Sequence, residues 1–474
     1  MLQTLKNAWR TKEIRNKIIF TLFILLLYRV GTVVPVPFVD ANNFAGSFRG
    51  TILDYMNILS GGSLGTATLF ALGVSPYINS SIIIQLLAVV FPKLGELAKN
   101  DKKKMNFITR IVTVALALVT AIGYYFLLAN SGMLTNAATK GQNSAYWFYA
   151  IVIIMCYCAG ASLIMWLAER VNERGIGNGI SIILFANIVA ALPSQVYQMI
   201  ALVVDTFNYE KPVLYIILAI LFALVLLAVI IAATVFVIWV TGSERRIPVQ
   251  YAKRVVGRKM YGGQNSNLPI KLNMTGVMPV IFASSIVSLV PTILALCGID
   301  GTGKSGWDTF ARIMGSQGVI YPIMLLVLII AFAYFYTQIT FDPVDVANNL
   351  KKQGGAIPGI RQGRPTSDYI RKILNKITLA GALFLSIIAV VPVIAGPHVI
   401  QHVIEWILSG QILDSWTASE IATAKTNITS IAQSLTGVFT FGGTSLIIVV
   451  GVALETFREL EAQLTMRNYK GFLD

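Results

Sequence analysis

The chain has 474 residues, of which 55% are hydrophobic and only 12% are charged, and its formal net charge is +15. Soluble globular domains carry about 25% charged residues, so this composition excludes an ordinary soluble domain and indicates a membrane protein. The positive excess does not by itself indicate nucleic-acid binding, because cytoplasmic loops of membrane proteins collect lysine and arginine. The three cysteines are an odd number in or beside apolar runs, which argues against a disulfide framework.

The chain begins with a basic segment, "MLQTLKNAWRTKEIRNK", ahead of the first apolar run. No small-residue cleavage site follows that run, so we expect an uncleaved first span rather than a signal peptide. A transmembrane helix needs about 20 mostly apolar residues. Ten segments meet that requirement: 18–36, 76–92, 106–129, 145–168, 179–201, 213–241, 274–297, 319–340, 374–394 and 435–454. They are too long for barrel strands, so the sequence predicts an all-α polytopic membrane protein.

Two regions do not fit this series of spans. Residues 37–75 are neither a clean span nor a polar loop, and the stretch 53–73 is small, glycine-rich and mildly apolar. Irregular backbone at membrane depth is tolerated only where protein or water surrounds it. Residues 395–434 form a long predicted outer loop with its own apolar pattern, which suggests one or two surface helices.

The distribution of lysine and arginine predicts the orientation. Thirty of these residues lie in the N-terminus, in the C-terminal tail, and in the loops after spans 2, 4, 6 and 8 counted with Arg110 and Lys376 at the adjoining ends of spans 3 and 9, against six on the opposite side. This bias predicts that both termini are cytoplasmic. The remaining basic residue, Arg29, lies inside the first span near its outer end, where we expect snorkelling or a contact with a helix end.

The two largest cytosolic loops, 242–272 and 341–373, are strongly basic. The stretch "ERRIPVQYAKRVVGRKMYGGQ" (244–264) holds six basic residues against one acid, namely Arg245, Arg246, Lys253, Arg254, Arg258 and Lys259. A few positive residues would fix the topology. The additional lysines and arginines would form a basic surface that binds phosphates or an acidic protein face. A solvated loop near anionic lipid is the alternative.

The middles of the ten predicted spans carry no Asp, Glu or His, the groups that proton- or ion-coupled transporters use. They carry branched apolar residues at helical spacing instead. Ile78 and Ile82 are four residues apart, and Ile180 and Leu184 repeat the spacing. Such a pattern is typical of ordinary packing, or it forms a hydrophobic constriction that blocks ions by dewetting.

Three motifs resemble chemical sites. "GIDGTGKS" (298–305) fits a phosphate-binding loop but follows a span on the outer face, where ATP is absent. "GIGNGI" (175–180) is interpreted as a tight turn that begins a span. His398, His402 and Glu405 share one helix face, and a metal site there competes with an interfacial helix. No nucleophile, base and orienting group assemble, so we expect no enzyme, no metal and no cofactor.

Five stretches, in this order along the chain, carry a family resemblance. They are "TLFALGVSPYINSSIIIQLL" (68–87) together with "WLAERVNERGIGNGISII" (166–183), then "RRIPVQYAKRVVGRKMYGGQ", "NNLKKQGGAIPGIRQG" (348–363) and "FGGTSLIIVV" (441–450). They resemble the SecY family of protein-translocation channels. The resemblance implies ten helices in two pseudo-symmetric halves around an hourglass pore. The halves are 1–205 with spans 1–5 and 206–455 with spans 6–10, and 456–474 is a cytosolic tail.

The resemblance also implies site residues. A pore ring is expected at Ile78, Ile82, Ile180, Leu184, Ile281 and Ile448, where Leu184 stands at a position that is often isoleucine. A plug is expected within 53–73, at Leu64, Gly65, Thr66, Ala67, Thr68, Leu69, Phe70, Ala71 and Leu72. A lateral gate opens between spans 2 and 3 and spans 7 and 8, and Gln85 and Leu289 are its expected residues.

The partners that the resemblance implies are the SecE and SecG subunits, the SecA ATPase, the ribosome through its RNA phosphates, signal sequences, unfolded preproteins and membrane lipid. The six basic residues of 244–264, together with Arg361, are expected to dock the cytosolic partners. The implied location is the bacterial cytoplasmic membrane.

Two other functions compete with a passive protein channel. A secondary transporter of a small solute would need coupling groups that the spans lack. An ATP-driven pump would rest on residues 298–305 alone, which lie on the wrong side of the membrane. The sequence therefore favours a channel driven by a partner.

Overall fold

The computed structural model describes residues 2–40, 57, 60–135, 146–208, 213–251, 254–256, 259–261, 265–297, 299, 306–315, 318, 320–409 and 443–466. The N-terminal group of helices is α1 (Leu2–Arg10), α2 (Lys12–Gly31), α4 (Ser75–Val90), α5 (Pro92–Asn100), α6 (Lys102–Asn130), α7 (Tyr146–Arg174) and α8 (Gly179–Asn208). The C-terminal group is α9 (Val213–Gly242), α10 (Met278–Leu296), α11 (Gly306–Met314), α12 (Ile320–Thr340), α13 (Pro343–Lys352), α14 (Arg364–Ser409) and a final helix over 443–466.

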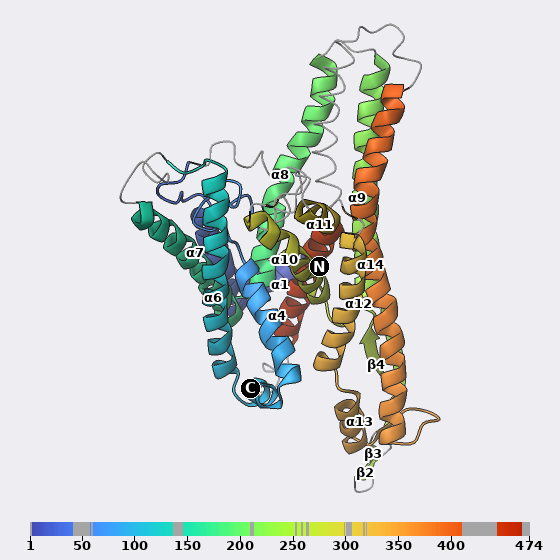
Figure 1. The fold of residues 1–474 in the computed structure, drawn as a ribbon. Helices are drawn as coiled ribbons and strands as arrows, with labels where there is room; N and C mark the ends of the chain where they lie inside the picture. The colour runs from blue at the N-terminus through green and yellow to red at the C-terminus, as the bar shows by residue number, and fades with distance from the viewer. Residues whose placement is uncertain are drawn as a thin grey trace.

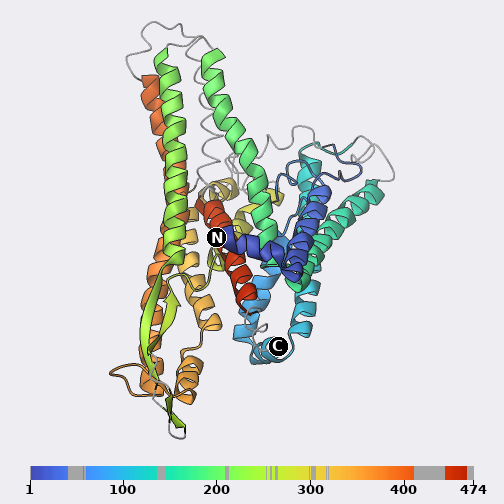
Figure 2. The same cartoon turned by 180° about the vertical axis from the view of Figure 1, so that it is seen from behind.

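The helices stand roughly side by side in two groups (Figure 1). In that view α6 and α7 lie on one side, α9, α12 and α14 lie on the other, and α4, α8 and α10 lie between them. From behind, the final helix is seen close to the N-terminal helices (Figure 2), and a side chain of α2 bonds to it. The two groups therefore meet along the middle of the molecule.

Local sequence signals explain several helix boundaries. The Asp101 carboxylate accepts a hydrogen bond from the backbone N–H of Lys104 at 3.2 Å and caps α6. Asp342 caps α13 in the same way, at 2.8 Å from the backbone N–H of Val344. A proline opens α4 and another opens α5, where the axes of the two helices differ by 118°. Because Asp101 accepts backbone N–H groups, its pKa lies below the usual value.

The two large basic loops, 242–272 and 341–373, contain strands that were not predicted from the sequence. Strand β1 (Glu244–Tyr251) pairs antiparallel with β4 (Asn265–Lys271) and with β5 (Gly355–Ala356), while β2 (Arg254–Val256) pairs with β3 (Lys259–Tyr261). The alternation within β1 explains this: Ile247 and Val249 are buried while their neighbours are exposed. They pack in one cluster with Ile370 and Leu374 of α14.

The main buried cluster lies where the two groups of helices meet. It combines residues of α2, α4, α7 and α8 with residues of α9, α10, α12, α14 and the final helix. A second cluster joins the segment 64–72 to α6 and α7. Large apolar side chains on α2, α6, α9 and α14 are instead exposed on the outside, as expected for helices that face lipid.

Each of the ten predicted spans overlaps a described helix, although α14 is much longer than the ninth span and residues 435–442 of the tenth lie outside the described residues. Within the described residues, four helices are long and apolar enough to cross a membrane by themselves, and the bent pair α4 and α5 adds a fifth. Three shorter apolar stretches lie in α8, α9 and α10. The mostly helical membrane fold is confirmed, whereas the count of ten spans stays a prediction.

The predicted outer loop 395–434 begins differently from expectation. Helix α14 runs without a break from the ninth predicted span to Ser409, so residues 395–409 are not a separate surface helix. The apolar sequence "HVIQHVIEWIL" continues the helical pattern and allows the helix to extend. Residues 410–434 lie outside the described part of the chain.

Candidate functional site

Helix α4 presents two isoleucines to the centre of the molecule. Pro76 lies in its first turn, where its missing N–H leaves no hydrogen bond unmade. Ile78 and Ile82 follow four residues apart, and each is only 2% exposed. The helical period therefore places both side chains on one buried face.

The start of α8 is fixed by its contact with the end of α7. The Asn172 side chain accepts a hydrogen bond from the backbone N–H of Gly179 at 2.7 Å. A Cβ at Gly179 would lie 2.0 Å from the carbonyl oxygen of Ala168, so only glycine allows this approach. The turn 175–180 is thus a structural junction, as predicted, and it directs Ile180 and Leu184 inward.

Five of the six residues of the expected ring belong to the main buried cluster, and the sixth, Ile180, packs against that cluster. Ile281 of α10 and Ile448 of the final helix are 2% and 1% exposed, and Leu184 is 2% exposed. All three belong to the main buried cluster with Ile78 and Ile82, and Ile180 packs against it as a partly buried residue. Four helices from both groups therefore contribute branched aliphatic side chains to one place.

The segment 60–74 folds back beside this cluster as a series of turns. The Tyr124 hydroxyl of α6 donates to the Leu64 carbonyl at 2.5 Å, and the Tyr157 hydroxyl of α7 donates to the Ala67 carbonyl at 3.2 Å. The backbone N–H of Leu69 donates to the Val34 carbonyl at 2.9 Å. Most of residues 64–72 are buried, so the segment is held by the N-terminal group of helices.

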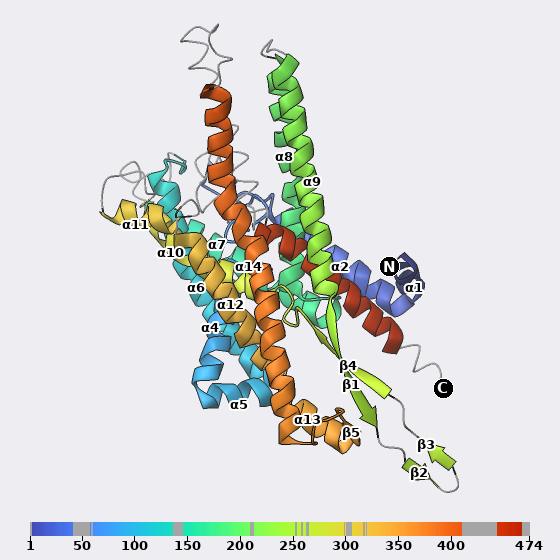
Figure 3. The same cartoon turned by 90° about the vertical axis from the view of Figure 1, so that its right-hand side faces the viewer.

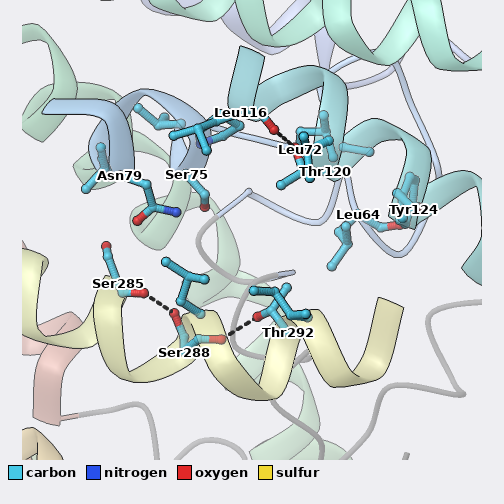
Figure 4. A pocket seen from close by; sticks show the side chains of 18 of the residues that line it. Leu64, Leu72, Ser75, Asn79, Leu116, Thr120, Tyr124, Ser285, Ser288 and Thr292 are labelled. Atoms are coloured by element: carbon cyan, nitrogen blue, oxygen red, sulfur yellow. Dashed lines mark hydrogen bonds between the residues drawn. The ribbon is translucent and has the colours of Figure 1, made fainter. Parts of the chain in front are cut away.

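A cavity of about 620 Å³ lies between this segment, the cluster and the helices α4, α6 and α10. Leu64 and Leu72 line it on one side, and α10 contributes Ser285, Ser288 and Thr292 on the other (Figure 4). Ile78, Leu184, Ile281 and Ile448 line it as well. The expected plug and four members of the expected ring therefore share one cavity.

Three of the four hydroxyl groups on α10 that line this cavity bond within their own helix. Ser284 donates to the Ile281 carbonyl at 2.9 Å, and Ser288 donates to the Ser285 carbonyl at 3.0 Å. Thr292 donates to the Ser288 carbonyl at 2.6 Å. Because these donors are satisfied locally, they present little unmet polarity to the cavity.

A side-chain hydrogen bond joins the two groups of helices beside the cavity. The Tyr336 hydroxyl of α12 donates to the Gln85 carbonyl oxygen of α4 at 2.5 Å. The Gln85 amide nitrogen donates to the Ser81 hydroxyl at 2.8 Å, which orients the amide. Leu289, the other expected gate residue, is partly buried and lines the cavity.

The expected docking residues are only partly described. Arg361 is exposed after β5, and Arg246 forms an exposed ion pair with Glu244 at 2.7 Å. Arg245 lies on the opposite face of β1, the face of Ile247 and Val249. Lys253 and Arg258 lie outside the described residues, as do the side chains of Arg254 and Lys259. The pKa of Lys271 on β4 is lowered, mainly because the side chain is partly buried and also because the positive charge of Arg458 is nearby.

The partners of several polar side chains were not predicted from the sequence. Arg29 donates to the Ala186 carbonyl of α8 at 2.5 Å, so it makes a helix contact rather than snorkelling to the surface. Arg110 of α6 and Glu169 of α7 form an ion pair with N–O distances of 2.7 and 2.9 Å. The signal for such contacts was the presence of polar side chains in or beside apolar spans, but the sequence does not name their partners.

The alternative chemical sites gain no support. Within the described residues no group of three His, Cys, Asp or Glu side chains could hold a metal ion. The side chains of His398, His402 and Glu405 lie outside the described part, and so do most residues of 298–305.

The comparisons with known proteins agree on one family. The sequence model of the SecY family matches residues 68–457. The protein translocase subunit SecY of Streptomyces galbus is 38% identical over 485 residues, and that of Mycobacterium bovis is 39% identical over 487 residues; each alignment covers 100% of both chains.

Solved structures extend this likeness to the fold. A protein-conducting channel has a TM-score of 0.59 at 17% identity, covering 94% of this chain and 92% of that one. A SecY protein whose plug domain stabilises the closed channel and maintains a membrane seal has a TM-score of 0.59 at 16% identity and the same coverage. Canine Sec61 from a ribosome–channel complex has a TM-score of 0.56 at 16% identity, again covering 94% and 92%.

Proposed function

Because the chain belongs to the SecY family of protein translocase subunits, we propose that it is the channel subunit through which unfolded preproteins cross the membrane. A partner supplies the energy, and signal sequences or transmembrane helices leave the channel sideways into lipid. The names of its relatives favour this function over a secondary transporter of small solutes.

The observation that carries the proposal is that six aliphatic residues from four helices lie in, or pack against, one buried cluster, and that four of them line the central cavity. A translocating chain carries every kind of side chain, so the channel cannot bind any one of them tightly. We assign the pore ring to Ile78, Ile82, Ile180, Leu184, Ile281 and Ile448, whose burial in one cluster supports the assignment. Such a ring excludes ions by dewetting and offers a passing chain no charge or hydrogen bond.

We assign the plug to residues 64–72. Small residues dominate this segment, so it loses little side-chain entropy when it packs. Its contacts with Tyr124 and Tyr157 are side-chain bonds to backbone carbonyls, which it exchanges for water when it leaves. Its position on the wall of the cavity supports a role in sealing the resting channel.

We assign the lateral gate to the seam between α4 and α6 on one side and α10 and α12 on the other. Gln85 and Leu289 lie on it, and three of the four hydroxyls of α10 that line the cavity bond within α10. Separation of the seam would therefore leave few buried donors unpaired. Signal sequences are apolar helices, and an opening toward the bilayer allows them to partition into lipid.

The cytosolic surface is the proposed docking site for the partners. Arg361 and the Arg254 and Arg258 pair would meet the SecA ATPase or ribosomal RNA phosphates, and the SecE and SecG subunits would complete the complex in the membrane. We further propose a bacterial cytoplasmic membrane location with both termini cytoplasmic, as the distribution of basic residues predicts. The division into halves is proposed near residue 205.

The test of the function is reconstitution of the chain with its partner subunits in vesicles. Added motor ATPase and ATP should make a preprotein inaccessible to external protease. A solute that moves down an ion gradient without the motor would contradict the proposal.

The pore ring is tested by ion leakage from such vesicles. Ile281→Ser combined with Ile448→Ser should raise the leak of the idle channel about tenfold, because hydroxyls stabilise water in the constriction. The matched control is Ile151→Ser on α7, whose side chain is 59% exposed and faces away from the cluster. An equal leak in both variants would refute the ring.

A further inference from the structure

A second, smaller cavity lies at the place where β1 passes the first turns of α14. Its volume is about 280 Å³, and its lining residues are Arg245, Tyr369, Lys372, Ile373, Lys376 and Ile377. Figure 3 shows the strands extending from the region beside the lower part of α14. This cavity is separate from the channel and from Arg361.

The sequence periodicities bring the three basic side chains together. Lys372 and Lys376 are four residues apart on α14, and Tyr369 lies three residues before Lys372, so these side chains share one helix face. On β1, Arg245 shares a face with Ile247 and Val249, which pack against that same helix. Arg245 is exposed, as Arg246 is, but it lies on the opposite face of β1 and lines the cavity together with the two lysines.

The positive charge in this cavity is not balanced by its own lining. None of the six lining residues is acidic. Glu244 is paired with Arg246 at 2.7 Å, and Asp368, one residue before Tyr369, is not among the lining residues. Three like charges around one concave space repel one another, and an anion placed between them removes that repulsion.

The helix face that continues from Lys376 toward the membrane is apolar and exposed. Leu379 and Leu383 are each 42% exposed, Ile387 is 56% exposed, and Val391 is 54% exposed, at steps of four residues. Lys376 is followed at once by this stripe. The cationic cavity and the apolar stripe therefore form one continuous surface with a charged end and a lipid-like end.

We propose that this surface is a binding site for one anionic phospholipid of the cytosolic leaflet. Arg245, Lys372 and Lys376 hold the phosphate group, the Tyr369 hydroxyl lies within the same cavity as a further donor, and an acyl chain lies along Leu379, Leu383 and Ile387. The inference rests on the proposed membrane orientation, which places the start of α14 on the cytosolic side.

The geometry favours a lipid over the other anions that could bind here. An RNA or an acidic protein surface would not cover the exposed aliphatic stripe. The small cavity also has room for only about one phosphate group. A free phosphate would occupy the charged end and leave the stripe uncovered. A phospholipid satisfies both ends at once.

The experiment uses the full chain assembled with its partner subunits in detergent. Dioleoyl phosphatidylglycerol is titrated after removal of endogenous lipid, and bound lipid is counted by native mass spectrometry. Each basic residue near a membrane surface contributes about 1 kcal/mol, so Lys372→Gln combined with Lys376→Gln should weaken binding about thirtyfold. Arg245→Gln alone should weaken it about fivefold.

The control has the same charge change elsewhere: Lys351→Gln combined with Lys352→Gln, at the exposed end of α13, should leave the binding within twofold of the unaltered chain. Equal losses in both double variants would show general charge attraction and overturn the site. Displacement of the lipid by millimolar inorganic phosphate would show a soluble-anion site, and loss of a partner subunit from the Lys372 and Lys376 variant would show a protein contact; either result overturns the proposal.

Preprotein transport is measured on the same samples. Normal lipid binding without transport would count against the channel function while leaving the lipid site intact. Normal transport with unchanged lipid binding in the Lys372 and Lys376 variant would overturn the lipid site alone.

Discussion

The interior of the N-terminal group of helices and the seam between the two groups are held by different kinds of contact. Inside the group, polar side chains bond from one helix to the next. Ser80 of α4 donates to the Thr109 carbonyl of α6 at 2.8 Å, and the Arg110–Glu169 ion pair joins α6 to α7. Separating these helices would leave buried polar groups without partners.

At the seam, α10 meets α4 and α6 mainly through apolar side chains and the cavity. The hydroxyls of Ser284, Ser288 and Thr292 bond to carbonyls of α10 itself, and the Tyr336–Gln85 bond crosses from one group to the other. The difference indicates a rigid group of helices beside a seam that can open with little loss of hydrogen bonding. A lateral gate needs this combination.

The largest expected effect comes from fixing the seam covalently. With the native cysteines replaced by serine, Gln85→Cys and Tyr336→Cys are joined by a short bismaleimide, which should reduce preprotein transport more than tenfold because the seam cannot part. The matched pair is Lys17→Cys and Gln463→Cys, whose native side chains bond at 3.1 Å between α2 and the final helix. Ala8, Ile14, Ile176 and Leu460 form a buried cluster at that junction. Its cross-link should change transport less than twofold, and equal inhibition by both cross-links would contradict the comparison.

The interior is tested by Glu169→Gln, which removes one partner of the Arg110 ion pair. We expect a loss of about 1–3 kcal/mol in the free energy of unfolding. This is less than for a fully buried ion pair, because the Arg110 side chain is 46% exposed. Thermal unfolding in nanodiscs measures it. Glu173→Gln breaks an exposed pair with Arg170 and should lose less than about 0.5 kcal/mol. Equal losses would show that the Glu169 pair gives the interior no special rigidity.

The crossing bond is tested by Tyr336→Phe. Loss of a hydrogen bond worth about 0.5–1.5 kcal/mol should favour the open seam and raise the export of a preprotein with a weakened signal sequence about three- to tenfold. The control is Tyr334→Phe on the same helix, whose hydroxyl donates to the Asn375 carbonyl within the C-terminal group at 3.1 Å. Export that stays unchanged in the Tyr336 variant would mean that this bond does not hold the gate closed.

The smallest effect separates two serines. Ser288→Ala should alter stability by less than about 0.5 kcal/mol, because its hydroxyl bonds to its own helix, whereas Ser80→Ala should lose about 1 kcal/mol by removing a buried bond between helices. Both are measured by thermal unfolding. A larger loss for Ser288 would place an important contact across the seam.

The sequence by itself determined where the apolar segments lie and that the chain is a membrane protein. It also determined that Ile78 and Ile82 share one helix face, as do Ile180 and Leu184. Hydrophobic length and helical period are local properties, so neither depends on the rest of the fold. The sequence motifs also identified the family, which the comparisons confirmed. The strands within 242–272 were not predicted, because the many basic residues of this loop obscure the short alternation of Ile247 and Val249.

Only the tertiary structure decided which distant polar groups meet. Tyr336 and Gln85 are 251 positions apart, Arg110 and Glu169 are 59 apart, and Arg245 faces Lys372 from a different element. The sequence shows only that each of these residues is a polar side chain on a helix or strand. The partner of each residue depends on how whole helices pack, since the apolar faces that fix their packing dictate which polar side chains come within hydrogen-bond distance.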